Sequence, residues 1–109
     1  MAYDETLAQR VKTHLVGIPG LVEKKMFGGV GFIINGNMAC GVHGPDLILR
    51  LSPEGYEQAI SQPHVRVFDM TGKPMKGWVL VAPGGYASEE ALDALIQQGV
   101  AFAQSLPPK

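Results

Sequence analysis

The residue types that most often carry chemistry in proteins are sparse in this sequence. Cys40 and His43 have the C-x-x-H spacing of a metal-binding pair, but residues three apart on a strand point to opposite faces. A structural zinc site needs four nitrogen or sulfur ligands, and His14 and His64 fall in other predicted elements. We therefore expect no metal or thiol chemistry, and we expect Cys40 to act as a small buried hydrophobic residue.

The stretch Gly28-Gly29-Val30-Gly31 is rich in glycine, as phosphate-binding loops are. Dinucleotide binding needs G-x-G-x-x-G between a strand and a helix, so that the pyrophosphate meets the helix N-terminus. Here Phe32-Ile33-Ile34 follows without a third glycine, and this apolar run predicts a strand. The glycines therefore predict a tight turn or bulge between two strands, with a small-molecule site near them as an alternative.

The carboxylates also have structural explanations. Glu54 and Glu57 fall on a short predicted helix, and Glu89, Glu90 and Asp93 fall at a helix N-terminus, where the macrodipole favours negative charge. The G-x-S-x-G pattern of a serine nucleophile does not occur. The sequence therefore predicts a protein that is not an enzyme and that needs no cofactor.

The basic residues are the better candidates for an interaction surface. Nine basic residues nearly balance ten acidic ones over the whole chain, so no strong global field attracts nucleic acid or an anionic membrane. Basic residues nevertheless outnumber acidic ones six to four between positions 24 and 76. They could form a basic face or an ordinary solvated surface. The candidate interaction residues are Lys24, Lys25, Arg50, Lys73 and Lys76.

Length and composition predict one cytoplasmic domain over residues 1–109. The chain has the usual length of a single domain, and its hydrophobic content of 46% is ordinary for a globular protein. One cysteine fits a reducing compartment, and the charged N-terminus lacks the apolar core of a secretory signal. Apolar runs stay far below the ~20 residues that cross a bilayer, so we expect no membrane partner.

Apolar periodicity predicts three helices. The spacing of Leu7, Val11 and Leu15 indicates a helix over 4–17, with Asp4 as its N-cap. A short helix begins at Ser52-Pro53 and ends near residue 61. The last helix begins at residue 88 and continues to about 105, and its apolar stripe consists of Leu92, Leu95, Ile96, Val100 and Ala103. Gly99 within it costs about 1 kcal/mol relative to Ala, so we expect a close packing contact there.

Alternating apolar stretches predict six strands, over 22–27, 30–34, 38–43, 47–51, 65–70 and 77–82. Asn35-Gly36 predicts a type I′ turn, which would place Ile33 opposite Met38, Phe32 opposite Ala39, and Gly31 opposite Cys40.

In the fourth strand, Leu47, Leu49 and Leu51 share one face, and Ile48 and Arg50 share the other. The element order α-β-β-β-β-α-β-β-α favours an α+β fold. We expect an antiparallel sheet of about five to six strands with helices on one face.

Four stretches together carry a family resemblance. They are Lys25-Met26-Phe27-Gly28-Gly29-Val30-Gly31-Phe32, Gly36-Asn37-Met38-Ala39, Leu47-Ile48-Leu49-Arg50-Leu51, and Met70 with Lys73-Pro74-Met75 and Gly77-Trp78. Over roughly residues 5–105 the chain resembles the N-terminal domain of the TfoX/Sxy competence regulators. The family motif maps to Met26, Phe27, Gly28, Gly29, Gly31, Arg50, Lys73, Pro74 and Trp78.

The resemblance implies a curved antiparallel sheet with helices, similar to type III secretion chaperones, and no catalytic residues. It implies Phe27 and Trp78 as packing residues, glycines that set backbone geometry, and Arg50 exposed and free to bind an acidic partner or a phosphate. Longer members regulate competence genes together with the cyclic-AMP receptor protein and continue into a second helical domain. This chain ends at Lys109, so we expect a stand-alone N-terminal domain.

From this we expect a regulatory module that binds a protein partner, beginning with a second copy of itself as a homodimer. The alternative is auxiliary nucleic-acid binding through the basic residues.

Overall fold

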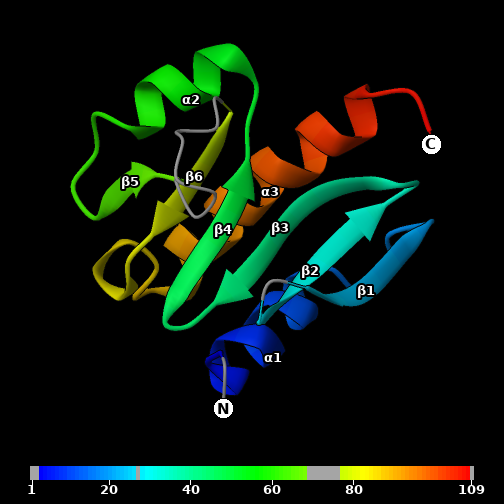
Figure 1. The fold of residues 1–109 in the computed structure, drawn as a ribbon, viewed down its shortest axis with the longest axis horizontal. Helices are drawn as coiled ribbons and strands as arrows, with labels where there is room; N and C mark the ends of the chain where they lie inside the picture. The colour runs from blue at the N-terminus through cyan, green and yellow to red at the C-terminus, as the bar shows by residue number, and fades with distance from the viewer. Residues whose placement is uncertain (1–2, 27, 69–76, 109) are drawn as a thin grey trace.

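The computed structural model describes residues 3–26, 28–68 and 77–108. In these residues three α-helices and six strands follow one another in the predicted order (Figure 1), which confirms the α+β fold. The elements are α1 (Glu5–His14), β1 (Leu21–Met26), β2 (Gly29–Ile34), β3 (Asn37–His43), β4 (Asp46–Arg50), α2 (Pro53–Ala59), β5 (Val65–Val67), β6 (Trp78–Val81), the 3₁₀ turn η1 (Pro83–Gly85) and α3 (Glu89–Ser105).

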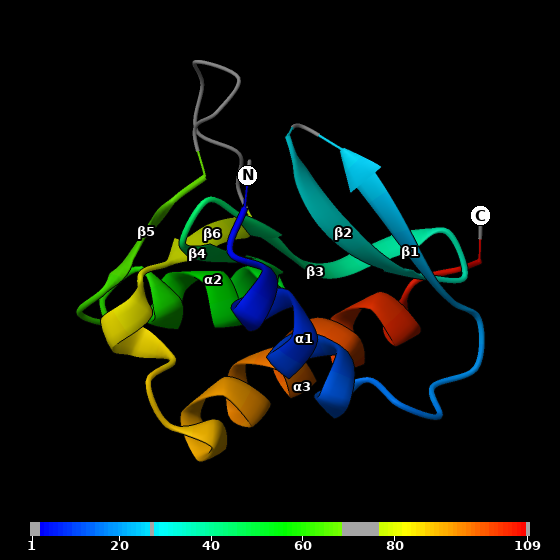
Figure 2. The ribbon, with the colours of Figure 1, turned by 90° about the horizontal axis from the view of Figure 1, so that it is seen from below.

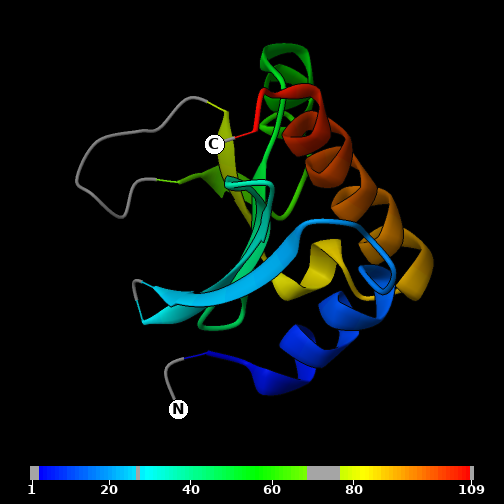
Figure 3. The same cartoon turned by 90° about the vertical axis from the view of Figure 1, so that its right-hand side faces the viewer.

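The strands form one antiparallel sheet in the order β1-β2-β3-β4-β6-β5. The first four strands are consecutive hairpins, and β6 then pairs with β4, which leaves β5 at the edge. Figures 2 and 3 show that the sheet is curved and that α1 and α3 cover the same face. We call this the helix face of the sheet, and the opposite one the far face.

Side-chain caps begin each helix at the expected residue. Asp4 accepts a hydrogen bond from the backbone N–H of Leu7 at 3.1 Å. Ser52 and Ser88 make the same N-cap contact at the starts of α2 and α3. The first helix ends at His14, earlier than the predicted residue 17, because the chain tightens at Leu15, whose N–H bonds to the Lys12 carbonyl. The last turn of the predicted helix is therefore a loop.

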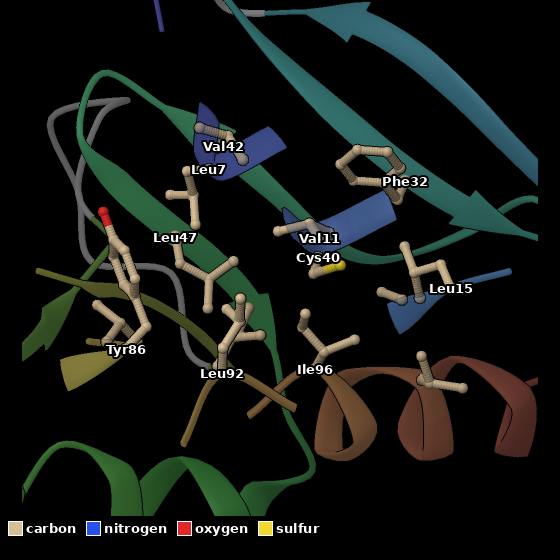
Figure 4. Packing of buried hydrophobic residues seen from close by; sticks show 14 of the residues in the cluster. Leu7, Val11, Leu15, Phe32, Cys40, Val42, Leu47, Tyr86, Leu92 and Ile96 are labelled. Carbon is tan, nitrogen blue, oxygen red and sulfur yellow. The ribbon is translucent and has the colours of Figure 1, made fainter. Parts of the chain in front are cut away.

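The main core lies between the sheet and the two long helices (Figure 4). Leu7 and Val11 of α1, and Leu15 directly after it, are buried in the main core. So are Leu92 and Ile96 of α3, which confirms the predicted stripes. Cys40 of β3 is fully buried among them. Burial disfavours the thiolate and raises the pKa of the Cys40 thiol to about 12. Cys40 therefore packs as the predicted hydrophobic residue.

The alternation predicted for β4 is confirmed. Leu47 and Leu49 belong to the main core on the helix face. Ile48 instead packs on the far face with Phe68 and Leu80, and the three form a small second cluster. Arg50 ends the strand, and its guanidinium lies near the rings of Trp78 on β6 and Phe102 on α3.

The β2–β3 hairpin turns at Asn35-Gly36, as the sequence predicts. Both residues have positive φ, 51° and 86°, as a type I′ turn requires. The predicted pairing of Ile33 with Met38 is also confirmed.

Beyond that pair the predicted register is wrong, because β3 contains a β-bulge. Phe32 pairs with Cys40 rather than with Ala39, and Gly31 pairs with Gly41. Ala39 is the extra residue, so Ala39 and Cys40 are both buried in the main core. A bulge cannot be read from turn geometry alone, since it arises where another element packs on the strand.

That element is α3. Gly99 is buried, and a Cβ atom there would lie 2.3 Å from the Ala39 carbonyl oxygen. The predicted close contact at Gly99 is thus confirmed, and the bulge is the place where the helix approaches the sheet backbone.

Candidate functional site

The structure places two of the four lysines of the predicted interaction surface, Lys24 and Lys25, on different faces of the sheet. Lys24 and Lys25 are consecutive on the edge strand β1 and therefore point to opposite faces. Lys25 pairs with Val30, which is part of the main core, so Lys25 lies on the helix face and Lys24 on the far face. Lys73 and Lys76 lie outside the described residues.

Arg50 lies at the end of β4, with β2 and β3 between it and the lysines of β1. Of the predicted basic residues that the structure describes, none therefore shares a site with Arg50.

Two aromatic rings surround the Arg50 guanidinium. Its central carbon lies 5.4 Å from the centroid of the Trp78 ring, which belongs to the paired position on β6. It lies 5.5 Å from the ring of Phe102, near the end of α3. Both distances are within cation–π range. The expectation of an exposed Arg50 is corrected: the side chain is partly buried and lies near two rings.

Arg50 lines a cleft of about 270 Å³ where β4 leads into α2. Trp78 and Phe102 line it together with Tyr56 and Glu57 of α2. We call this the Arg50 cleft. It places one cation, one carboxylate and three aromatic rings around a shared opening, formed by segments far apart in the sequence.

Among the described residues, no ion pair uses the N–H donors of the Arg50 guanidinium. A guanidinium has five N–H donors, and a cation–π contact with a ring uses none of them as a hydrogen bond. The cleft can therefore hold a carboxylate or phosphate beside an apolar or aromatic group.

The glycine-rich stretch has a structural role. Gly28, with φ of 74°, lies between β1 and β2, and a Cβ on Gly29 would lie 2.1 Å from the Val42 carbonyl oxygen. A strand follows rather than a helix, so the geometry of a dinucleotide loop is absent from this described stretch. Met26 ends β1, and Phe27 lies outside the described residues.

Cys40 and His43 do not converge on one point. Cys40 is in the core on the helix face, and His43 lies three positions further along β3, on the far face. Within the described ranges, no three metal-ligating side chains gather into a site that could hold an ion.

A polar cluster between α1 and α3 was not predicted from the sequence. Both ring nitrogens of His14 contact carboxylates of α3, at 2.9 Å to Glu89 and 3.1 Å to Asp93. Arg10 bonds to the same Glu89 at 2.7 Å. Hydrogen bonds from His14 and then Arg10 hold the pKa of Glu89 below its ordinary value.

The same Arg10 side chain ties α1 to the segment before α3. It donates to the Tyr86 carbonyl oxygen at 3.0 Å and lies 5.6 Å from the Tyr86 ring centroid. The Tyr86 hydroxyl donates in turn to the Pro45 carbonyl oxygen. The sequence explains Glu89 and Asp93 only by their position at a helix N-terminus. Their partners on α1 are distant in the sequence, so no spacing pattern connects them.

Together, the fold and the cleft define a small α+β domain with a curved antiparallel sheet and an arginine–aromatic cleft at one end of its strands. The family model of the TfoX N-terminal domain matches residues 13–103. The match spans most of the 109 residues, and the chain belongs to this family. No curated protein matches the chain. Across the described parts of the chain, every helix is too short or too polar to cross a membrane.

Proposed function

We propose that this chain is a non-catalytic regulatory module that binds an acidic segment of a protein partner in the Arg50 cleft. Membership of the TfoX N-terminal domain family supports the regulatory part of the proposal. The observation that carries the binding part is the Arg50 guanidinium held against Trp78 and Phe102 at the opening of a cleft.

The arrangement suits protein recognition because Arg50 is already ordered. Two rings restrict the guanidinium, so less side-chain entropy is lost when it binds a carboxylate. Arginine and tryptophan are also the residues that most often dominate binding energy at protein interfaces. An aspartate or glutamate flanked by an apolar residue would match both the guanidinium and the rings.

The lining of the cleft favours a protein partner over nucleic acid. Glu57 contributes a carboxylate that balances the charge of Arg50, so the described lining offers one cation for a single carboxylate and no net positive charge for a continuous phosphate backbone. Two strands, β2 and β3, separate Lys24 and Lys25 from Arg50, so these lysines do not extend its positive charge.

A second copy of this chain is the simplest partner and the first to test. Light scattering at micromolar concentration would show a mass near twice 11.7 kDa if the chain forms a homodimer. Loss of that mass in Arg50→Gln would connect self-association to the cleft. A monomer at all concentrations would remove self-association and leave a different protein as partner.

Capture from the cells that make the protein tests the proposal in general. Wild-type protein should retain a partner that Arg50→Gln loses and that Lys24→Gln, a control on β1, still retains. The retention should weaken with salt, since it depends on a charged contact. Partners unaffected by Arg50→Gln, or capture abolished by nuclease, would contradict the proposal, and the second outcome would favour the nucleic-acid alternative.

A further inference from the structure

A second cavity lies between α2 and α3, against the ends of β5 and β6. Its volume is about 470 Å³, within the range of small-molecule sites in proteins. It shares no lining residue with the Arg50 cleft. We call it the α2–α3 groove.

The groove has an apolar floor and a neutral polar rim. Val65, Val81 and Leu95 contribute apolar surface from the sheet and from α3. The amides of Gln58, Gln62 and Gln98 and the imidazole of His64 supply the polar side-chain groups. No Asp, Glu, Lys or Arg occurs among the described residues that line it. A ligand therefore meets hydrogen-bond donors and acceptors but no countercharge.

His64 forms one wall of this groove in an unusual backbone conformation. Its φ of 68° lies in the left-handed region, which residues other than glycine adopt rarely. The His64 carbonyl oxygen accepts a hydrogen bond from Ala82 at 2.7 Å, which ties the strained residue to the end of β6. Non-glycine residues in this region gather at functional sites, where the surrounding structure holds them.

The strained backbone brings the His64 ring onto Gly84. A Cβ atom on Gly84 would lie 2.5 Å from Cε1 of that ring, so only glycine allows the ring to approach this closely. The imidazole is thus backed by the η1 backbone on one side, and it lines the groove. It provides a flat surface suited to stacking.

We propose that the α2–α3 groove binds an uncharged purine nucleoside. Glutamine amides match the paired donor and acceptor on the edge of adenine, and an imidazole ring stacks on a base. The apolar floor accepts the remainder of a planar ring. A phosphate would find no cation in the described lining, so the phosphorylated form should be discriminated against.

Titration of the full chain with adenosine, followed by calorimetry or ligand-observed NMR, tests this proposal. Adenosine should bind saturably, and adenosine monophosphate should bind at least tenfold more weakly. Gln98→Ala should weaken adenosine binding at least fivefold. Gln104→Ala is the matched control, because Gln104 is an exposed glutamine of the same helix that does not line the groove.

A filled groove gives an independent check. Ala94 is exposed and lines the groove, so Ala94→Phe should block it without disturbing the core, which far-UV circular dichroism would verify. Adenosine binding should be lost in a folded Ala94→Phe variant. Absence of saturable adenosine binding at millimolar concentration, equal affinity for the monophosphate, or unchanged affinity in Gln98→Ala would overturn the proposal. Arg50→Gln should leave adenosine affinity unchanged, so failure here is distinct from failure of the protein-binding proposal.

Discussion

Gly99 of α3 lies against the backbone carbonyl of Ala39 in β3, so closely that a Cβ atom at position 99 would be 2.3 Å from the oxygen. The contact occurs at the β-bulge, where Ala39 and Cys40 are both buried against the helices. The long helix is therefore positioned by backbone-to-backbone proximity and not only by side-chain packing.

Gly99→Ala should destabilise the protein, although alanine is the better helix former by about 1 kcal/mol. The added methyl group meets a backbone carbonyl, which cannot rotate away, so α3 or β3 must shift. We expect a net loss of about 1–3 kcal/mol in the free energy of unfolding, measured by urea denaturation. At the exposed position 101, Ala101→Gly should lose about 1 kcal/mol, the ordinary propensity effect. A Gly99→Ala variant that is more stable than wild type would contradict the close contact between position 99 and the Ala39 carbonyl oxygen.

Arg50→Lys should alter the environment of Trp78, the only tryptophan of the chain. A lysine keeps the charge but lacks the planar group that stacks on Trp78 and Phe102. We expect a shift in tryptophan emission and a loss of about 0.5–1 kcal/mol in stability. Lys24→Gln on the distant strand β1 should change neither quantity. An unchanged emission spectrum in Arg50→Lys would count against the ring contact.

Acidification should weaken the contact between α1 and α3 through Glu89. The pKa of this carboxyl is lowered in the folded state by His14 and Arg10, against an ordinary value of 4.5. Its stabilising contribution is thus complete above pH 4.5 and is lost as the pH falls through the lower folded-state pKa. In thermal unfolding between pH 7 and 3, the melting temperature of wild type should exceed that of Glu89→Gln at pH 7. The two melting temperatures should become equal at the acidic end.

Glu90→Gln is the control for that experiment. Glu90 lies in the same first turn of α3, so it shares the helix-dipole effect, but it takes part in none of the ion pairs of the described residues. Its effect on the melting temperature should be smaller than that of Glu89→Gln at pH 7. Equal changes in melting temperature for the two variants would mean that Glu89 stabilises the protein only through the helix dipole.

Cys40 should resist thiol reagents in the folded protein. The thiolate is the reactive form, and a pKa of about 12 leaves very little of it at pH 8. The residue is also completely buried. Labelling with an aromatic disulfide reagent should be slow in buffer and complete in urea, with a midpoint that follows unfolding measured by circular dichroism. Rapid labelling of native protein would show that the core opens locally at β3.

The amino-acid sequence predicted the elements well where the signal was local. Apolar spacing located α1 and α3, and the hydroxyl caps Ser52 and Ser88 marked the starts of two helices. Asn35-Gly36 identified the β2–β3 turn because both residues adopt positive φ there. These signals depend on residues close together in the sequence, so they can be recognised without knowledge of the tertiary structure. The family followed from short motifs in the same way.

The candidate sites were harder to predict because their parts are distant in the sequence. Arg50 was identified as an interaction residue, but Phe102 was not associated with it. The groove lined by His64 and Gln98 had no sequence signal, since glutamines at a helix surface are common and a strained histidine leaves no pattern.

The sequence by itself therefore determined the order of helices and strands, the buried faces and the family, because periodicity, capping and turn chemistry act over short stretches. Only the tertiary structure decided that β3 bulges beneath Gly99 and that Arg50 stacks on two rings. It also decided that His14 connects α1 to α3. Each of these depends on how segments far apart in the chain pack together, and packing of whole surfaces, not local preference, sets those contacts.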